Sequence, residues 1–336
     1  MFPQVCLNHV LIRKKLIKDI FKVFVILLFS FTTGSASTEE IVFGTLSEEV
    51  FESKLLGERR LLIYSPSEEV IDQDTTFIII QDGQYLFDGN VNWRDEEWGI
   101  DETLQSLNKK NKLPNIVVVG VENAARTNGG KLLDESKRYA EYFPKQAIKY
   151  FGFGFRKFAY QNFVDLEKFD YIKFLEEELI PYLEDKFERD MSSKNMGILG
   201  SSMGGLISLN ALIELPHRFG FAASLSTDWI GIRPLDYALF PFRSEIRFFG
   251  DPYTTEAIYS YITENIDVLR EKKIYLDRGT ESLDQFYEGP QNKIDEIFSS
   301  NALTFQSLVF EGFGHNPKDF GKRFEGVLNF ILDENR

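Results

Sequence analysis

Residues 196–206, M-G-I-L-G-S-S-M-G-G-L, contain a serine whose surroundings suit nucleophilic chemistry. An apolar run ends in the pattern Gly-x-Ser-x-Gly between Gly200 and Gly204, and a helix-compatible run over residues 206–214 follows. A strand, a sharp turn and a helix with serine at the turn form a nucleophile elbow. Only very small side chains fit two residues before and after that serine, which suits both glycines. We therefore predict that Ser202 is the nucleophile; the alternative is an ordinary Gly/Ser turn before a helix.

A serine hydroxyl needs a base, usually a histidine that is held by a carboxylate. Beyond residue 36 the chain has two histidines, His217 and His315. His217 lies near the end of the helix that follows Ser202, roughly 20 Å away at about 1.5 Å per residue, and is expected on the surface. His315 lies in a glycine-flanked loop after the last predicted strand, and this loop returns to the same sheet edge as the serine. The sequence thus predicts His315 as the base.

The acid should lie between the serine and the histidine in the sequence. The loop after the predicted strand at residues 273–277 offers Asp277, Glu281 and Asp284. Asp277 ends the strand and could serve only to hold the loop together through backbone hydrogen bonds. Asp284 opens the next predicted helix, where an aspartate is also a common N-cap. We favour Asp284 as the acid, with Glu281 as the alternative.

An oxyanion intermediate also needs two backbone amide donors. One should be the amide of Met203, directly after the nucleophile. The other should follow the predicted strand at residues 75–80, where Asp82-Gly83-Gln84 lets the backbone turn closely. The amide of Gln84 is the candidate there.

The remaining pattern alternates strands with helices. Residues 49–64 predict an antiparallel hairpin at a sheet edge. Further strands are expected at residues 75–80, 115–121, 219–226, 273–277 and 303–310, and helices at 97–107, 167–187, 255–269, 284–298 and 317–332. Strands that are apolar throughout, separated by helices, indicate a mostly parallel, doubly wound α/β sheet in one domain over residues 37–336.

An aromatic-rich segment, residues 122–163, interrupts this alternation. It carries Gly129-Gly130 and ten aromatic residues, Tyr139, Tyr142, Phe143, Tyr150, Phe151, Phe153, Phe155, Phe158, Tyr160 and Phe163. One interpretation is a loop packed by its own rings. The other is a cap insertion over the active site, and the two are compatible.

Residues 1–36 have the order of a secretory signal peptide: basic, then apolar, then small. Five Lys or Arg residues precede the apolar run at 23–31, and small residues surround Ala36 and Ser37. We expect cleavage near that pair, with an uncleaved anchor as the alternative. Cys6, the single cysteine, lies in this segment, so disulfides and thiolate sites are excluded from the remainder. A cysteine-free exported protein fits a bacterial periplasm or exterior.

The charge of the chain excludes some partners. Subtracting the five bases and one acid of residues 1–36 from the chain's 38 and 52 gives a net charge of −18. This charge repels nucleic acid and anionic membranes, so we expect neither as a partner. With two histidines and no cysteine no metal cluster emerges, and no Lys-Ser/Thr follows the glycines to make a phosphate loop. We expect no cofactor and leave the oligomeric state open.

Together these stretches resemble the putative esterase family of α/β-hydrolases, which includes enterochelin esterases, feruloyl esterases and S-formylglutathione hydrolases. The matching stretches are IIIQDGQYLFDG, GVENAART, RYAEYFP, ELIPYLEDKF, GILGSSMGGLISL, LSTDWIG, IYLDRGTESLDQFYEGPQ and FGH. They extend from about residue 40 to the C-terminus. The resemblance implies an α/β-hydrolase fold, Ser202 and His315 as catalytic residues, and an oxyanion hole at Gln84 and Met203.

Two positions depart from the family pattern. Members often carry the acid three residues after the loop glycine, where this chain has Ser282. Similar sequences tend to have histidine before the tryptophan of LSTDWIG, where this chain has Asp228. The favoured function is an exported serine hydrolase that cleaves a small-molecule or glycan-linked carboxylic ester through an acyl-enzyme. An acyltransferase with the same triad and a catalytically silent ligand- or carbohydrate-binding member are the alternatives.

Overall fold

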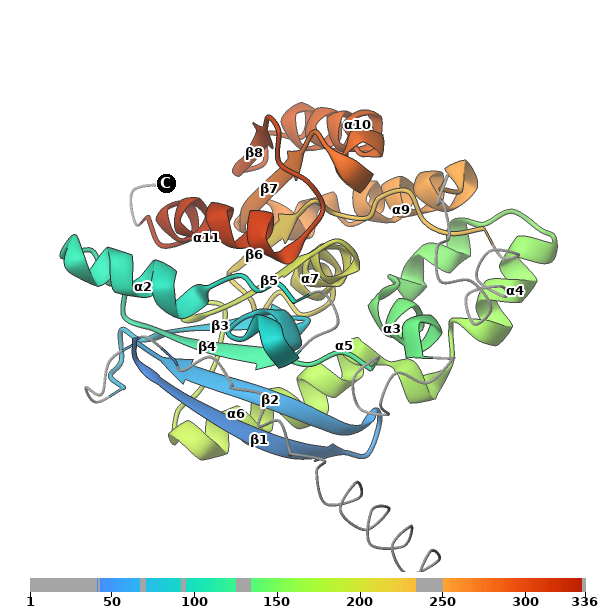
Figure 1. Ribbon diagram of the computed structural model, residues 1–336. Helices are drawn as coiled ribbons and strands as arrows, with labels where there is room; N and C mark the ends of the chain where they lie inside the picture. The colour runs from blue at the N-terminus through green and yellow to red at the C-terminus, as the bar shows by residue number, and fades with distance from the viewer. Residues whose placement is uncertain are drawn as a thin grey trace, which may run out of the picture. The chain divides into compact units, whose positions relative to one another are not determined.

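Strand β3 (Thr76–Gln81) is buried on both faces, as its continuous apolar run predicted. Phe77 and Ile79 point into a core shared with helix α7 (Met203–Glu214), whereas Ile78 and Ile80 point into a second core shared with helix α11 (Pro317–Ile331). Successive side chains of a strand point to opposite faces, so a strand that is apolar throughout needs helices on both sides. Figure 1 shows the helices on both sides of the sheet.

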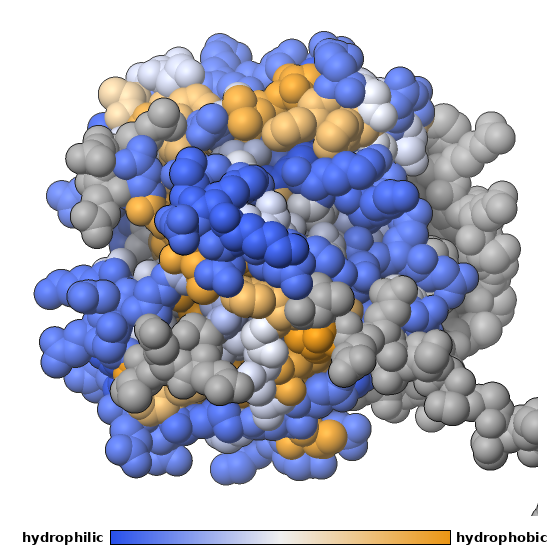
Figure 2. Space-filling model, turned by 60° about the vertical axis from the view of Figure 1, so that its left-hand side comes forward, coloured by the Kyte–Doolittle hydropathy of each residue, from blue (hydrophilic) through white to orange (hydrophobic). Residues whose placement is uncertain are grey.

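The computed structural model describes residues 41, 43–66, 71–91, 95–124, 134–233 and 250–333. The predicted signal peptide, residues 1–36, lies outside this part of the chain. None of the helices in the described ranges is both long and apolar enough to cross a membrane. On the face shown in Figure 2, hydrophilic residues surround several separate apolar patches.

Within the described residues the sheet has eight strands in the order β1-β2-β4-β3-β5-β6-β7-β8. β2 pairs antiparallel with β1 and β4, and all the other pairs are parallel. The remaining strands are β1 (Thr45–Ser53), β2 (Gly57–Ser65), β4 (Ile116–Val121), β5 (Met196–Ser201), β6 (Phe221–Leu225), β7 (Lys273–Gly279) and β8 (Phe305–Phe310). The predicted edge hairpin and the mostly parallel sheet are both confirmed.

Helices α2 and α11 pack on one face of the sheet, and most other helices pack on the opposite face. Besides α7 and α11, the α-helices of the described residues are α2 (Ile100–Lys109), α3 (Asp134–Tyr142), α4 (Phe155–Phe163), α5 (Tyr171–Phe174), α6 (Ile180–Phe187), α9 (Pro252–Glu264) and α10 (Glu288–Ser300). Short 3-10 segments are η1 (Gly83–Tyr85), η2 (Gly89–Val91), η3 (Lys145–Tyr150), η4 (Glu167–Phe169), η7 (Ile266–Leu269) and η8 (Ser282–Phe286).

The continuous helix predicted over residues 167–187 is divided into η4, α5, a π-helical segment η5 (Leu175–Leu179) and α6. Pro181 lies in the first turn of α6. It has no amide hydrogen, and its ring would clash with the carbonyl group four residues earlier. A π-helical turn just before the proline accommodates the missing bond. The prediction of helical structure over residues 167–187 was right, but the prediction of one continuous helix was wrong.

The aromatic-rich segment forms α3, η3 and α4, and its rings divide into two groups. Tyr139, Phe143 and Phe151 are buried around Tyr160, with centroid distances to its ring of 4.8–6.4 Å. Phe153 and Phe155, by contrast, are exposed at the start of α4. The interpretation as a segment packed by its own rings therefore holds for the first group.

Helix α11 approaches the loop before α2 very closely at Gly321. A Cβ atom on this glycine would lie 1.8 Å from the carbonyl oxygen of Trp98, which is a backbone atom. Gly326 lies on the exposed side of the same helix, and a Cβ there would have no neighbour within 4 Å. Substitution of Gly321 tests the close packing, whereas substitution of Gly326 reports helix propensity alone.

We expect Gly321→Ala to lower the free energy of unfolding by about 1–3 kcal/mol, because the backbone must shift. Gly326→Ala should raise it by up to about 1 kcal/mol, because alanine favours a helix more than glycine. Urea denaturation of both variants measures the two changes. Equal effects of both substitutions would contradict the close contact at Trp98.

Candidate active site

Ser202 occupies the turn between β5 and α7, with φ 57° and ψ −126°. Such a backbone conformation costs on the order of 1–3 kcal/mol in a residue other than glycine. A Cβ atom on Gly200 would lie 2.6 Å from the carbonyl carbon and oxygen of Gly204. One on Gly204 would lie 3.0 Å from Cβ of Gln81. The turn therefore has the geometry expected of a nucleophile elbow.

Two backbone hydrogen bonds attach this turn to the segment that follows β6. The amide of Ser202 donates to the carbonyl of Leu225 at 2.9 Å, and the amide of Asp228 donates to the carbonyl of Ser202 at 3.2 Å. Leu225 ends β6. The residues after β6 are consequently held beside Ser202.

His315 lies in the loop between β8 and α11, where its ring contacts a buried carboxylate. Its Nδ1 lies 2.6 Å from Oδ1 of Asp284. The rings of Tyr287 and Phe320 meet the imidazole edge-on, with centroids 5.6 and 5.2 Å away. His315 and Ser202 line one cavity of about 100 Å³. The structure thus brings together the serine, the histidine and the favoured aspartate.

Asp284 is 0% exposed, and several donors surround its carboxylate. Its Oδ2 accepts hydrogen bonds from Ser226 Oγ at 2.5 Å and from the Gly279 amide at 2.7 Å. Burial alone would raise the pKa of Asp284, but the hydrogen bonds from His315, Ser226 and Gly279 hold this pKa below its usual value. The carboxylate is ionised at neutral pH and can hold a proton on Nδ1 of His315.

The competing acids have other environments. Glu281 is exposed, and its amide donates to the Phe313 carbonyl at 3.0 Å. Asp277 is fully buried and pairs with Arg323 Nη1 at 2.6 Å. The helix predicted to open at Asp284 in fact begins at Glu288, and Asp284 lies in η8. Asp284 is therefore not the N-cap that the sequence allowed.

Arg323 connects these groups from the buried side of α11. Besides Asp277, it donates to Ser226 Oγ at 3.0 Å and to the Gly314 carbonyl at 3.4 Å. Ser226 in turn donates to Asp284. Arg323 was not singled out in the sequence. A signal was present, because this arginine falls on the same helical face as the buried Phe320, Phe324 and Val327.

The two predicted amide donors lie at the start of α7 and in the turn after β3. Met203 is the first residue of α7, where an amide has no acceptor within the helix. Gln84 is buried in η1, and its side-chain Oε1 accepts a hydrogen bond from the Asn123 amide at 3.3 Å. Its neighbours Asp82 and Tyr85 line the cavity that contains Ser202 and His315.

Asp82 is a site residue whose partners the sequence did not reveal. Its backbone has φ 59°, and its carboxylate accepts hydrogen bonds from Arg138 Nε at 2.9 Å and Nη2 at 2.7 Å. Asn123 Nδ2 donates to it at 2.5 Å. Arg138 belongs to α3, so the aromatic-rich insertion contacts the turn that follows β3.

Ser202 also lines a second cavity of about 120 Å³. Its walls come from α3, the start of α7, the loop after β6 and the η8 region, and the residues are Arg138, Tyr139, Ser202, Met203, Asp228, Ile230, Gly231, Ile232, Leu283 and Tyr287. Tyr139 shows that part of the insertion reaches Ser202, as the cap interpretation required. Ser202 therefore lines two cavities.

The family described as "Putative esterase" matches residues 53–330, which is most of the chain. The chain belongs to the putative esterase family. Among curated relatives, "Uncharacterized protein YbbA" of Bacillus subtilis (strain 168) is 26% identical over 186 residues. That match covers 54% of this chain and 60% of YbbA, so the chain spans less than two thirds of this relative.

Solved structures of esterases share the fold. A ferulic acid esterase matches with a TM-score of 0.59 and 14% identity, over 86% of this chain and 98% of that one. An S-formylglutathione hydrolase from Agrobacterium tumefaciens matches with a TM-score of 0.57 and 15% identity, over 88% and 98%. These likenesses confirm the predicted α/β-hydrolase fold.

This member of the family differs from the family pattern in its acid loop. Ser282, where members often carry the acid, has φ 57° and begins η8. The 3-10 turn places the carboxylate two residues later, at Asp284, within 2.6 Å of His315. His217, expected on the surface, is exposed and contacts Glu176.

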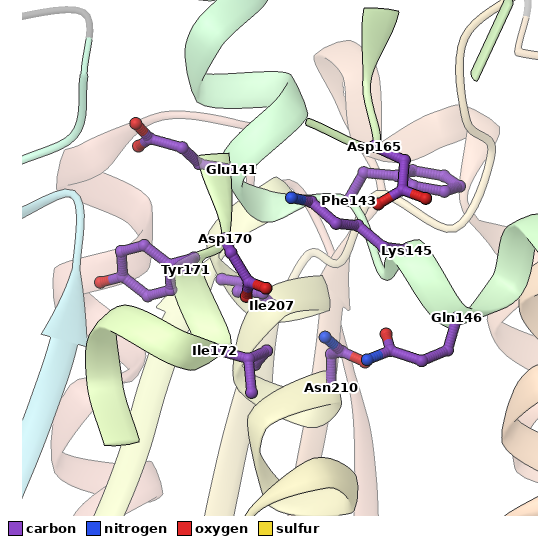
Figure 3. A pocket seen from close by; sticks show the side chains of 10 residues that line it. All are labelled: Glu141, Phe143, Lys145, Gln146, Asp165, Asp170, Tyr171, Ile172, Ile207 and Asn210. Carbon is purple, nitrogen blue, oxygen red and sulfur yellow. The ribbon is translucent and has the colours of Figure 1, made fainter. Parts of the chain in front are cut away.

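A larger cavity, of about 280 Å³, lies away from these residues (Figure 3). Figure 3 shows Lys145, Asp165 and Asp170 among its lining side chains. Ile207 and Asn210 of α7 also line it, but Ser202, Asp284 and His315 do not. This cavity is separate from the candidate active site.

We expect Arg323→Met to lower the free energy of unfolding by about 3–5 kcal/mol at pH 8, because it leaves Asp277 buried without a counter-charge. Burial already raises the pKa of Asp277 to about 6, despite Arg323. An acid whose pKa is raised by folding lowers stability as the pH rises from its unfolded pKa through its folded pKa, and the penalty disappears as the pH falls. Arg323 lowers the pKa of Asp277, so its loss raises this pKa further and enlarges the penalty at pH 8. The deficit of the variant should therefore shrink between pH 8 and pH 5.

Urea denaturation of the wild type and of Arg323→Met between pH 5 and pH 8 measures this change in the free energy of unfolding. The double variant Asp277→Asn/Arg323→Met is the control, since it removes both charges and should recover part of the loss. A deficit that does not change with pH would mean that lost packing, and not the unpaired carboxylate, is the cause.

Proposed function

We propose that this protein is a serine hydrolase that cleaves carboxylic esters through an acyl-enzyme. The observation that carries the proposal is the 2.6 Å contact between His315 Nδ1 and Asp284 Oδ1, beside a cavity shared with Ser202. Membership of the putative esterase family supports it. Ser202 is the nucleophile, His315 the base and Asp284 the acid that orients the base.

The ionised Asp284 keeps the proton of neutral His315 on Nδ1, which leaves Nε2 as the acceptor. Nε2 removes the proton of Ser202 as Oγ attacks the ester carbonyl. The resulting oxyanion is stabilised by the amides of Met203 and Gln84. His315 then protonates the leaving alcohol, and an acyl group remains on Ser202.

In the second half of the reaction a water molecule replaces the alcohol. His315 removes its proton, a second oxyanion forms in the same amide site, and the acid leaves with Ser202 regenerated. If another alcohol attacks instead of water, the same machinery transfers the acyl group. The products separate these outcomes, since hydrolysis releases the free acid.

Ser202→Ala should abolish labelling by a fluorophosphonate probe and lower kcat/KM on short-chain aryl esters by about 10⁴-fold or more, because no nucleophile remains. Gel fluorescence and release of nitrophenolate measure the two effects. A wild-type protein that neither reacts with the probe nor cleaves these esters would rule out the proposed activity.

Asp284→Asn should lower kcat by about 10⁴-fold, because the amide no longer holds the required tautomer of His315. Glu281→Gln is the matched control on the same loop and should change kcat by less than about twofold, because this side chain is exposed. Burst and steady-state kinetics on one aryl ester compare the two variants. A large loss in Glu281→Gln alone would assign the acid to Glu281.

A further inference from the structure

The backbone of Asp228 lies beside Ser202. Its amide donates to the carbonyl of Ser202 at 3.2 Å. The next residue, Trp229, is fully buried, and its indole Nε1 donates to Gln291 Oε1 at 2.9 Å. These contacts hold the backbone at Asp228 next to the turn that carries Ser202.

One oxygen of the Asp228 carboxylate has no hydrogen-bond donor. Oδ1 of Asp228 is shielded from solvent and accepts no hydrogen bond within the described residues. Burial raises the pKa of Asp228 to about 6, and the nearby amides of Ile230 and Gly231, together with Arg138, offset this only in part. Asp228 is still mostly ionised at pH 8. A buried, ionised oxygen without a donor is costly, which points to a partner from outside the chain.

The cavity that Asp228 lines has no other unbalanced charge among its lining residues. The guanidinium of Arg138 also lines it, but two of its nitrogen atoms donate to the carboxylate of Asp82. Apart from Ser202, the remaining lining residues are apolar or aromatic. Two of them, Tyr139 and Tyr287, carry aromatic rings, a class of side chain that can attract cations.

The Tyr287 hydroxyl adds a second unsatisfied polar group to this cavity. Burial raises the pKa of Tyr287, and the nearby carboxylates of Asp228 and Asp284 add to this; its Oη has no hydrogen-bond partner at ordinary geometry. The hydroxyl of Tyr139, by contrast, is bonded to Tyr160 Oη at 2.7 Å. Asp228 Oδ1 and Tyr287 Oη are therefore the polar atoms left for a ligand.

A carboxylate that is only partly compensated next to Ser202 has a consequence for the reaction. The tetrahedral intermediate carries a negative charge, and a nearby anion in a water-poor site raises its energy. A positive group bound between them would cancel that repulsion and satisfy Oδ1. A neutral substrate supplies no such group.

We propose that the cavity beside Ser202 binds an ammonium group of the ester substrate, with Asp228 Oδ1 as its acceptor. The inference rests on the proposed esterase activity and adds the substrate class: esters whose acyl or alcohol part carries an amine. Asp228 is the residue that determines this specificity. The aliphatic walls accommodate the short alkyl chain that carries the amine.

The experiment compares kcat/KM for matched ester pairs at pH 8. One pair is the 4-nitrophenyl ester of an ω-aminoalkanoic acid and the ester of the alkanoic acid with a methyl group in place of the ammonium. The other pair places the ammonium in the alcohol, as 6-aminohexyl and heptyl butanoate, because either part can enter the cavity. Wild type, Asp228→Asn and Glu281→Gln are assayed on both pairs.

We expect wild type to favour the ammonium member of one pair by about tenfold or more, as for other close charge pairs in buried sites. Asp228→Asn should lose that preference and cleave the neutral member severalfold faster, because the repulsion of the intermediate is removed. Glu281→Gln removes one exposed charge from a neighbouring loop and should keep the wild-type preference. Equal rates in wild type, or a preference that survives Asp228→Asn, would overturn the inference.

A binding measurement separates this inference from the proposed activity. Calorimetric titration with hexylammonium ion should detect binding to wild type and at least tenfold weaker binding to Asp228→Asn, with hexanol as the neutral control. Equal affinity of both proteins for the ion contradicts the ammonium site. Absence of probe labelling and of ester cleavage contradicts only the catalytic proposal, and the titration still decides the site.

Discussion

A carboxylate that is removed from water must be surrounded by donors, and in this protein Asp284 imposes that condition on three loops. Its partners come from the loop after β8 (His315), from the segment after β6 (Ser226) and from the end of β7 (Gly279). Because all three partners must reach one buried side chain, the loops at this sheet edge are fixed relative to one another. Loss of any one partner would leave charge or polarity unsatisfied in the interior.

Backbone strain is concentrated at the same edge. Of the eight non-glycine residues with positive φ in the described part of the chain, Asp82, Ser202, Ser226 and Ser282 lie in this region. Hydrogen bonds hold these conformations, including the bonds from Ser202 to Leu225 and from Ser226 to Asp277. The strands themselves are regular, and the strained backbone conformations lie in the turns that follow them.

The parts of the fold that were predictable are those that a local pattern determines. The all-apolar run of β3 indicated burial on both faces, and the glycines around Ser202 indicated the tight turn. The choice between Asp284 and Glu281 was not readable in this way, because it depends on a 3-10 turn that points one carboxylate inward and leaves the other in water. The ion pair of Asp82 with Arg138 joins distant segments, so neither residue carries a local signal for it. Arg323 did carry one, as a charge on an apolar helical face.

The contact between Arg138 and Asp82 bears on the placement of the aromatic-rich insertion. Arg138 belongs to the inserted helix α3, whereas Asp82 belongs to the sheet edge that carries Ser202, and two hydrogen bonds join them. Moving α3 away would strand a buried aspartate without its counter-ion, which is an expensive opened state. The ion pair therefore favours the arrangement in which α3 contacts the turn after β3, and any displacement of α3 has to break it first.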